Sequence, residues 1–194
     1  MRARPFLALA LTALLLPLAA CGDKAPPTGG GTPAGPAQAA QPGSDDATAK
    51  GLMTFLQAVI ASPDKRAALS ATLRPSKADL EALFDAELAA AAEATYGPAW
   101  DNGELVLGPK KPEQTEVQLT AATVEDIQAW RGDAAAKFAG GWKKVAPHLA
   151  PGHTFYSAKL VVPGEDLGMR FDGFVHLNGG WRIVPAPWRL LKDN

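Results

Sequence analysis

The chain has 194 residues, with 19 basic and 20 acidic side chains and a formal net charge of −1. Because no basic excess is available to attract phosphate backbones, nucleic acid is excluded as an expected partner. The single cysteine, Cys21, excludes a disulfide within the chain and any metal site built from several thiolates.

Residues 1–20 have the pattern of an export signal. A short cationic start with Arg2 and Arg4 precedes the apolar stretch 6–16, which only Thr12 interrupts. Eleven helical residues span about 16 Å, roughly half of a bilayer core. This length fits a signal segment and is too short for a transmembrane helix.

The signal ends in Leu18-Ala19-Ala20-Cys21, a leucine and two small residues before a cysteine. This motif resembles the lipobox of bacterial lipoproteins. The resemblance implies that the Cys21 sulfur receives a diacylglyceryl group, that cleavage follows Ala20, and that the new amine receives a further acyl chain such as palmitate. Several acyl chains hold a protein firmly on a bilayer, since each buried methylene contributes about 0.8 kcal/mol. We therefore expect an envelope lipoprotein on the lipid bilayer, and Gly22 after the cysteine favours the outer membrane facing the periplasm.

The segment that follows the signal has the composition of a tether. Residues 22–46 contain six glycines, five prolines and five alanines, and no aromatic or β-branched apolar residue. Such a segment cannot bury enough surface to offset its ordering entropy. We expect the lipidated cysteine and a disordered tether over 21–46. Residues 47–194 are then long enough to form a single globular domain.

Helical patterns dominate the first half of this domain. Helices are predicted at 47–61, 65–73, 77–84, 86–96 and 123–130. Ser76 followed three residues later by Asp79 predicts a capping box at the start of the third helix. Asp85 is a good N-cap for the fourth helix, which Gly97-Pro98 is expected to end.

Strand patterns dominate the second half. Strands are predicted at 104–107, 115–121, 153–162, 168–177 and 181–184. Residues 132–152 are expected to form a loop with a helical turn. Asn178-Gly179 is typical of a tight hairpin. Asp172-Gly173 is a second turn signal, but a turn there would leave a very short strand, so a continuous strand with a glycine bulge is preferred.

Helices followed by antiparallel strands predict an α+β fold, with N-terminal helices packed on one face of a curved antiparallel sheet. This order over 47–191, with the closing segment Gly-Trp-Arg-Ile-Val-Pro at 180–185, resembles the nuclear transport factor 2-like superfamily. In that superfamily a bent sheet wraps around an N-terminal helix. The extra helices between 65 and 96 depart from its pattern. Its members include isomerases, dehydratases and non-catalytic binding modules, so the resemblance implies no single function.

The predicted strand 168–177 carries the best candidates for catalysis. Strict alternation places Met169, Phe171, Val175 and Leu177 on one face, and Arg170, Asp172, Phe174 and His176 on the other. A small hydrolase or isomerase could use a pocket near Arg170, Asp172 and His176, with the histidine as general base. The other interpretation is a solvated sheet face opposite a core face, and it is favoured.

Other signals of chemistry are weak. His148 and His153 could share a metal ion, but no convincing third ligand lies nearby in the sequence, and no metal is expected. The chain has no G-x-S-x-G elbow, no H-E-x-x-H motif and no Walker loop, so no cofactor is expected. The leading hypothesis is a non-catalytic module that binds an envelope protein or a small ligand.

Two groups of residues could form a binding surface. The five tryptophans could be an aromatic platform, but anchors of the core and its rim are favoured: Trp100, Trp130, Trp142, Trp181 and Trp188. Small side chains between 86 and 100 could admit a partner backbone, with Tyr96 and Trp100 as anchors. The alanines of this surface are Ala86, Ala89, Ala90, Ala91, Ala92, Ala94 and Ala99. Plain helix propensity explains the same alanines and is favoured.

Overall fold

A computed structural model describes residues 42–191, with side chains from Thr48 onward. The expected signal, Cys21 and most of the expected tether lie outside the described residues. The helices are α1 (Pro42–Ala61), α2 (Arg66–Ala71), α3 (Lys77–Leu83), α4 (Ala86–Asp101), α5 (Val124–Ala129), α6 (Gly132–Lys137) and α7 (Trp142–Val145). Short 3-10 helices are η1 (Pro63–Lys65), η2 (Ala146–His148) and η3 (Pro187–Leu190).

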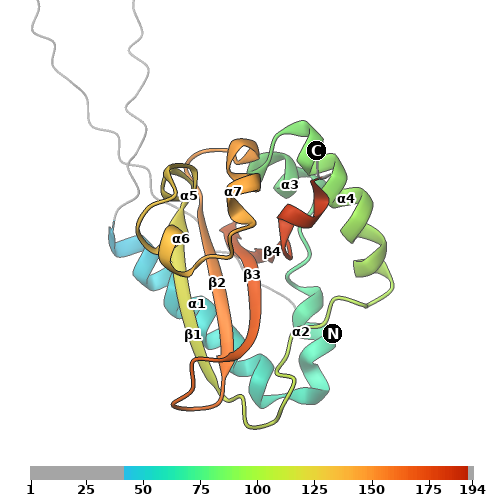
Figure 1. Cartoon of the computed structure of the whole chain (residues 1–194). Helices are drawn as coiled ribbons and strands as arrows, with labels where there is room; N and C mark the ends of the chain where they lie inside the picture. Colours follow the sequence, from blue (N-terminus) through green and yellow to red (C-terminus); the bar gives the residue numbers. More distant parts are fainter. Residues whose placement is uncertain (1–41, 192–194) are drawn as a thin grey trace, which may run out of the picture. The chain divides into compact units, whose positions relative to one another are not determined.

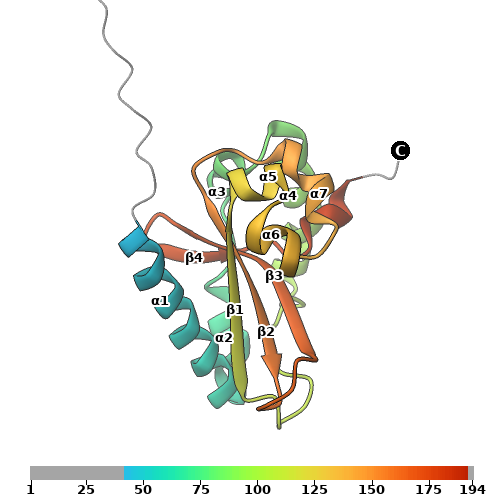
Figure 2. The ribbon, with the colours of Figure 1, turned by 60° about the vertical axis from the view of Figure 1, so that its left-hand side comes forward.

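The strands are β1 (Glu116–Thr123), β2 (Thr154–Val161), β3 (Gly168–Leu177) and β4 (Gly180–Ile183). They form one antiparallel sheet in the order β1-β2-β3-β4 (Figure 1). The predicted α+β class is confirmed. Figure 2 shows α1 along one side of this sheet and α6 on the other, so helices cover both faces where one was expected.

The start of α3 shows how a short sequence motif fixes a helix. Ser76 accepts a hydrogen bond from the backbone N–H of Asp79, and the Asp79 carboxylate accepts one from the backbone N–H of Ser76. This reciprocal pair is the predicted capping box. The same carboxylate also accepts from Arg182 Nε and Asn178 Nδ2, each at 2.9 Å. Asp79 therefore ties α3 to the hairpin between β3 and β4.

That hairpin turns at Asn178-Gly179, as predicted. Both residues have positive φ, 50° and 74°, which suits a two-residue turn between antiparallel strands. Leu177 pairs with Gly180 across the turn. The turn therefore sets the register of β4 against β3.

The predicted bulge in β3 is also confirmed. Tyr156 pairs with Phe174, but the next residue of β2, Ser157, pairs with Asp172. Gly173 is the additional residue, with a φ of +93°. Its carbonyl accepts a hydrogen bond from Val184 N–H at 3.0 Å, so the bulge also fixes the chain after β4.

This bulge changes the faces of β3, and the predicted assignment of four side chains was wrong. One extra residue resets the alternation, so Phe174 shares a face with Tyr156, Phe171 and Met169. His176 lies on this same face, opposite Trp181 of β4. Val175 and Leu177 lie instead on the face of Arg170 and Asp172, where they pack in the core on the side of the sheet opposite α1.

Each face of the sheet buries its own core. On the face toward α1, the core contains Leu52, Leu56, Val59, Leu73, Trp100, Leu107, Val117, Tyr156, Ala158, Leu160, Phe174 and Ile183. On the opposite face, the helices α3 to α7 contribute most of the core around Trp142, which is fully buried and packs against Phe155 and Trp188. All five tryptophans are buried or half-buried. The interpretation as anchors of the core and its rim therefore accounts for them.

Two predicted helix boundaries were wrong. α1 begins at Pro42, so the last five residues of the expected tether are helical. α4 continues through Gly97-Pro98 to Asp101. A proline in a last turn forfeits one backbone hydrogen bond, and here the burial of Trp100 outweighs that loss.

The predicted strand 104–107 is absent, and this segment has no regular secondary structure. Leu107 nevertheless enters the core on the α1 face, and its N–H donates to the buried Ser70 hydroxyl at 2.9 Å. The expected loop at 132–152 instead contains α6, α7 and η2. These short helices complete the core on the face opposite α1.

Candidate functional site

Two of the three residues suggested for catalysis lie together, and the third does not. Arg170 Nε lies 3.4 Å from Asp172 Oδ1, on the sheet face that carries α6. His176 lies on the opposite face, where its ring meets Trp181 edge-on with centroids 5.3 Å apart. The bulge at Gly173 causes this separation, so the predicted group of three is not formed.

Arg170 forms part of a polar cleft with a volume of about 470 Å³. The cleft is lined by residues of α6 and of the sheet. Figure 2 shows α6 on the side of the sheet opposite α1. The lining residues of the cleft are Gln118, Leu119, Thr120, Ala136, Lys137, Ser157, Lys159, Asp166 and Arg170. We call this feature the polar cleft. It has the size of small-molecule sites in proteins.

The floor of the polar cleft is built by strand register. Gln118, Lys159 and Arg170 are direct cross-strand neighbours on β1, β2 and β3. The adjacent row is formed in the same way by Thr120, Ser157 and Asp172. Because neighbouring side chains in a row share a face, six polar groups from three strands gather over two rungs of the sheet.

Arg170 is held in place by several contacts. Its Nε donates to Ser157 Oγ at 3.0 Å, and its Nη2 donates to the backbone carbonyl of Lys137 in α6. Ser157 and Asp172 are buried, with 2% and 9% of their surfaces exposed. The guanidinium group is therefore fixed between the sheet and α6 and needs little reorganisation to contact a ligand.

Sequence reasoning missed most of the polar cleft. Gln118 and Thr120 alternate with apolar residues in β1, as Ser157 and Lys159 do in β2. This alternation was visible in the predicted strands. However, it identified a shared site only once the pairing of β1 with β2 was known.

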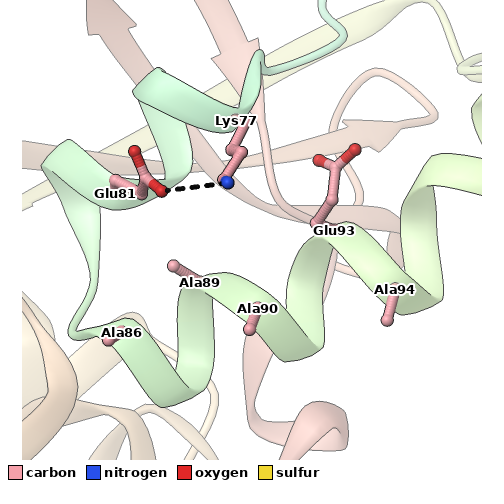
Figure 3. Close-up of a pocket in the computed structure, with 7 residues that line it drawn as sticks. All are labelled: Lys77, Glu81, Ala86, Ala89, Ala90, Glu93 and Ala94. Carbon is pink, nitrogen blue, oxygen red and sulfur yellow. Dashed lines mark ion pairs between the residues drawn. The ribbon is translucent and has the colours of Figure 1, made fainter.

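A second cavity, of about 450 Å³, lies between α3 and α4. Its lining residues are Lys77, Glu81, Ala86, Ala89, Ala90, Glu93 and Ala94 (Figure 3). Lys77 and Glu81 form an ion pair at 3.7 Å on its α3 side. This groove contains the exposed part of the alanine-rich surface that the sequence suggested for docking.

The anchors predicted for that surface are not available to a partner. Trp100 is buried, with 9% of its surface exposed. Tyr96 is half-buried, and its hydroxyl donates to the carbonyl of Pro185. Ala89 and Ala92 are buried as well. Much of the alanine-rich face is therefore used for packing within the domain.

The two histidines that flank 149–152 have separate roles. His148 Nδ1 lies 2.7 Å from Asp85 Oδ2, at the start of α4. His153 Nε2 lies 3.1 Å from the carbonyl oxygen of Ala82. Within the described side chains, no three histidine, cysteine, aspartate or glutamate residues group closely enough to hold a metal ion.

None of the helices between residues 42 and 191 is long and apolar enough to cross a membrane. No protein-family model, no curated protein and no solved structure matches the chain. The resemblances to the lipobox and to the nuclear transport factor 2-like superfamily therefore stay predictions from the sequence.

Proposed function

We propose that the chain is a lipid-anchored protein of the bacterial cell envelope whose domain binds a small polar molecule in the polar cleft without transforming it. The observation that carries this proposal is the fixed polar floor of that cleft. Five polar side chains from three strands line the cleft, among them the buried Ser157, and the buried Asp172 lies behind Arg170. Pre-positioned polar groups lower the entropic cost of binding.

Binding without catalysis is favoured by what the cleft contains. Its titratable groups are Lys137, Lys159, Asp166 and Arg170, with Asp172 behind Arg170. The one histidine of the proposed catalytic group lies on the other face of β3. General acid–base chemistry at neutral pH most often needs a group that titrates near that pH, and histidine is the usual one.

The anchor is supported by the sequence. The lipobox precedes Cys21, and the described domain begins only at Pro42. The intervening segment would act as a spacer between the proposed lipid and α1. We propose the outer membrane, facing the periplasm, as the place of the domain, because Gly22 follows the cysteine.

Cys21→Ser is expected to abolish acylation and to leave an uncleaved precursor, because the serine hydroxyl cannot accept the diacylglyceryl group as a thiol does. The measurement is metabolic labelling with palmitate, together with the mass of the purified chain. Gly22→Ala is the matched control and should be labelled and cleaved normally. Normal labelling and cleavage of Cys21→Ser would refute the proposed anchor.

Binding in the polar cleft is expected to be lost when the cleft is filled. Ala136 and Ala135 are both exposed on α6, but only Ala136 lines the cleft. Ala136→Trp should abolish the amide chemical shift changes that small polar metabolites cause in the full chain in detergent. Ala135→Trp should leave them unchanged. The proposed function would be contradicted if no metabolite of a broad panel bound, or if the Ala136→Trp variant still bound the metabolites that the unmodified chain binds.

A further inference from the structure

We propose that the polar cleft recognises a hydroxylated small molecule through one anionic group, a carboxylate or a phosphate, which Lys159 and Arg170 bind together. This inference rests on the proposed function and adds the chemistry of the ligand. Sugar acids and sugar phosphates have the required combination of one anion and several hydroxyl groups.

The charges that face the cleft leave one cation without an acidic partner. Lys137 Nζ is paired with Asp133 at 3.2 Å, and Arg170 is paired with Asp172. Lys159 Nζ donates at 3.0 Å to the backbone carbonyl of Asp166, which carries no charge. In the part of the chain that the structure describes, no carboxylate oxygen lies within ion-pairing distance of Lys159. An anionic ligand would supply the missing charge.

Arg170 supplies a second donor in a fixed position. Its Nε and Nη2 are occupied by Ser157 and the Lys137 carbonyl, whereas Nη1 has no hydrogen-bond partner among the described residues. Arg170 and Lys159 are direct cross-strand neighbours, so their side chains leave the same face of the sheet side by side. Hydrogen bonds from charged donors to an oxyanion are roughly twice as strong as neutral ones.

The rest of the cleft favours a hydroxylated ligand. The Gln118 amide lies on the same rung as the two cations and the Thr120 hydroxyl on the adjacent rung, and both can donate and accept. Ala136 adds a short apolar wall from α6. A volume of about 470 Å³ leaves room for a ligand larger than a bare inorganic anion.

The carboxylate of Asp166 opposes this recognition. Asp166 is exposed at the rim of the cleft, where it repels an anion through water. Its removal should therefore strengthen binding by two- to threefold, a small effect because exposed charges are screened. If the ligand were not anionic and Asp166 only contributed a polar contact to it, removing the carboxylate would weaken binding. A gain in affinity therefore indicates an anionic ligand.

The test is calorimetric titration of the full chain in detergent with glucuronate, glucose 6-phosphate, glucose and inorganic phosphate. We expect glucuronate or glucose 6-phosphate to bind at least tenfold more tightly than glucose and than inorganic phosphate. The charged sugar that binds more tightly distinguishes a carboxylate from a phosphate ligand. Lys159→Gln should weaken that binding at least tenfold, Lys159→Arg should largely retain it, and Asp166→Asn should strengthen it.

Lys65→Gln is the matched control, because Lys65 is exposed on η1, lies outside the cleft and loses the same charge. Glucose binding as tightly as the charged sugars, or equal losses in Lys65→Gln and Lys159→Gln, would overturn the anionic ligand. So would a failure of both charged sugars to bind. In these cases the proposed function stands if neutral metabolites bind the unmodified chain and this binding is lost in Ala136→Trp. The proposed function fails if no metabolite binds.

Discussion

Gly173→Ala is expected to lower the free energy of unfolding by about 2–5 kcal/mol. Gly173 has a φ of +93°, which residues other than glycine adopt at a cost of about 1–2 kcal/mol. A Cβ at this position would also overlap the carbonyl oxygen of Val184. Backbone cannot rotate away as a side chain can, so the overlap must be relieved by moving β3 or the segment after β4, which adds a further cost of about 1–3 kcal/mol.

Chemical denaturation measures this effect, and Gly164→Ala is its matched control. Gly164 has a similar φ of +84°, but a Cβ there would meet no atom within 4 Å. The control should therefore lose only the conformational part of the cost, about 1–2 kcal/mol. Equal losses in the two variants would show that the bulge tolerates a side chain and that its fit against Val184 is loose.

The same bulge explains why the sequence predicted strand β3 but not which of its side chains share a face of the sheet. Asp172-Gly173 was sufficient to predict a bulged strand, because the alternative turn left too few residues for β3. However, the faces were assigned by strict alternation, which a bulge interrupts. This is why His176 was grouped with Asp172, although the two lie on opposite faces of the sheet.

Local signals predicted the elements that depend on local contacts. The Ser76 capping box and the Asn178-Gly179 turn involve residues within a few positions of one another, and both formed as expected. Elements decided by distant packing were predicted less well. α4 continues through Pro98 because Trp100 is buried against the core beside α1, a contact that neighbouring residues do not reveal.

The polar cleft depends on distant pairing in the same way. Lys159 and Arg170 are eleven positions apart, and Gln118 is more than forty positions before Lys159. Only the register of β1, β2 and β3 places them in one row. A sequence without this register shows polar residues in three strands, which is also the pattern of a solvated sheet face.

Asp79→Asn is expected to lower the free energy of unfolding by about 3 kcal/mol at neutral pH, because it removes the charge from a buried ion pair. The Asp79 side chain is only 3% exposed and accepts hydrogen bonds from Arg182, Asn178 and the backbone of Ser76. Burial raises the pKa of Asp79, but these hydrogen bonds together outweigh it and lower the pKa to about 2.

This lowered pKa gives the substitution a second, pH-dependent signature. An aspartate with an ordinary pKa of 3.8 when unfolded and about 2 when folded stabilises the fold above pH 4. This contribution, about 2 kcal/mol, is lost as the pH falls from 4 to 2. Denaturation at a series of pH values should therefore show a smaller acid-induced loss in Asp79→Asn than in the unmodified chain.

Asp64→Asn provides the control, because Asp64 is exposed in η1 and forms no ion pair with another described residue. It should change stability by less than about 0.5 kcal/mol and leave the acid-induced loss intact. An Asp79→Asn variant that matches this control at neutral pH would show that the link between α3 and the β3–β4 hairpin adds no net stability. If only the acid-induced loss were unchanged, stability near pH 3 would depend on other carboxylates. Asp85 and Asp126 would be the first to test, because hydrogen bonds also lower their pKa values.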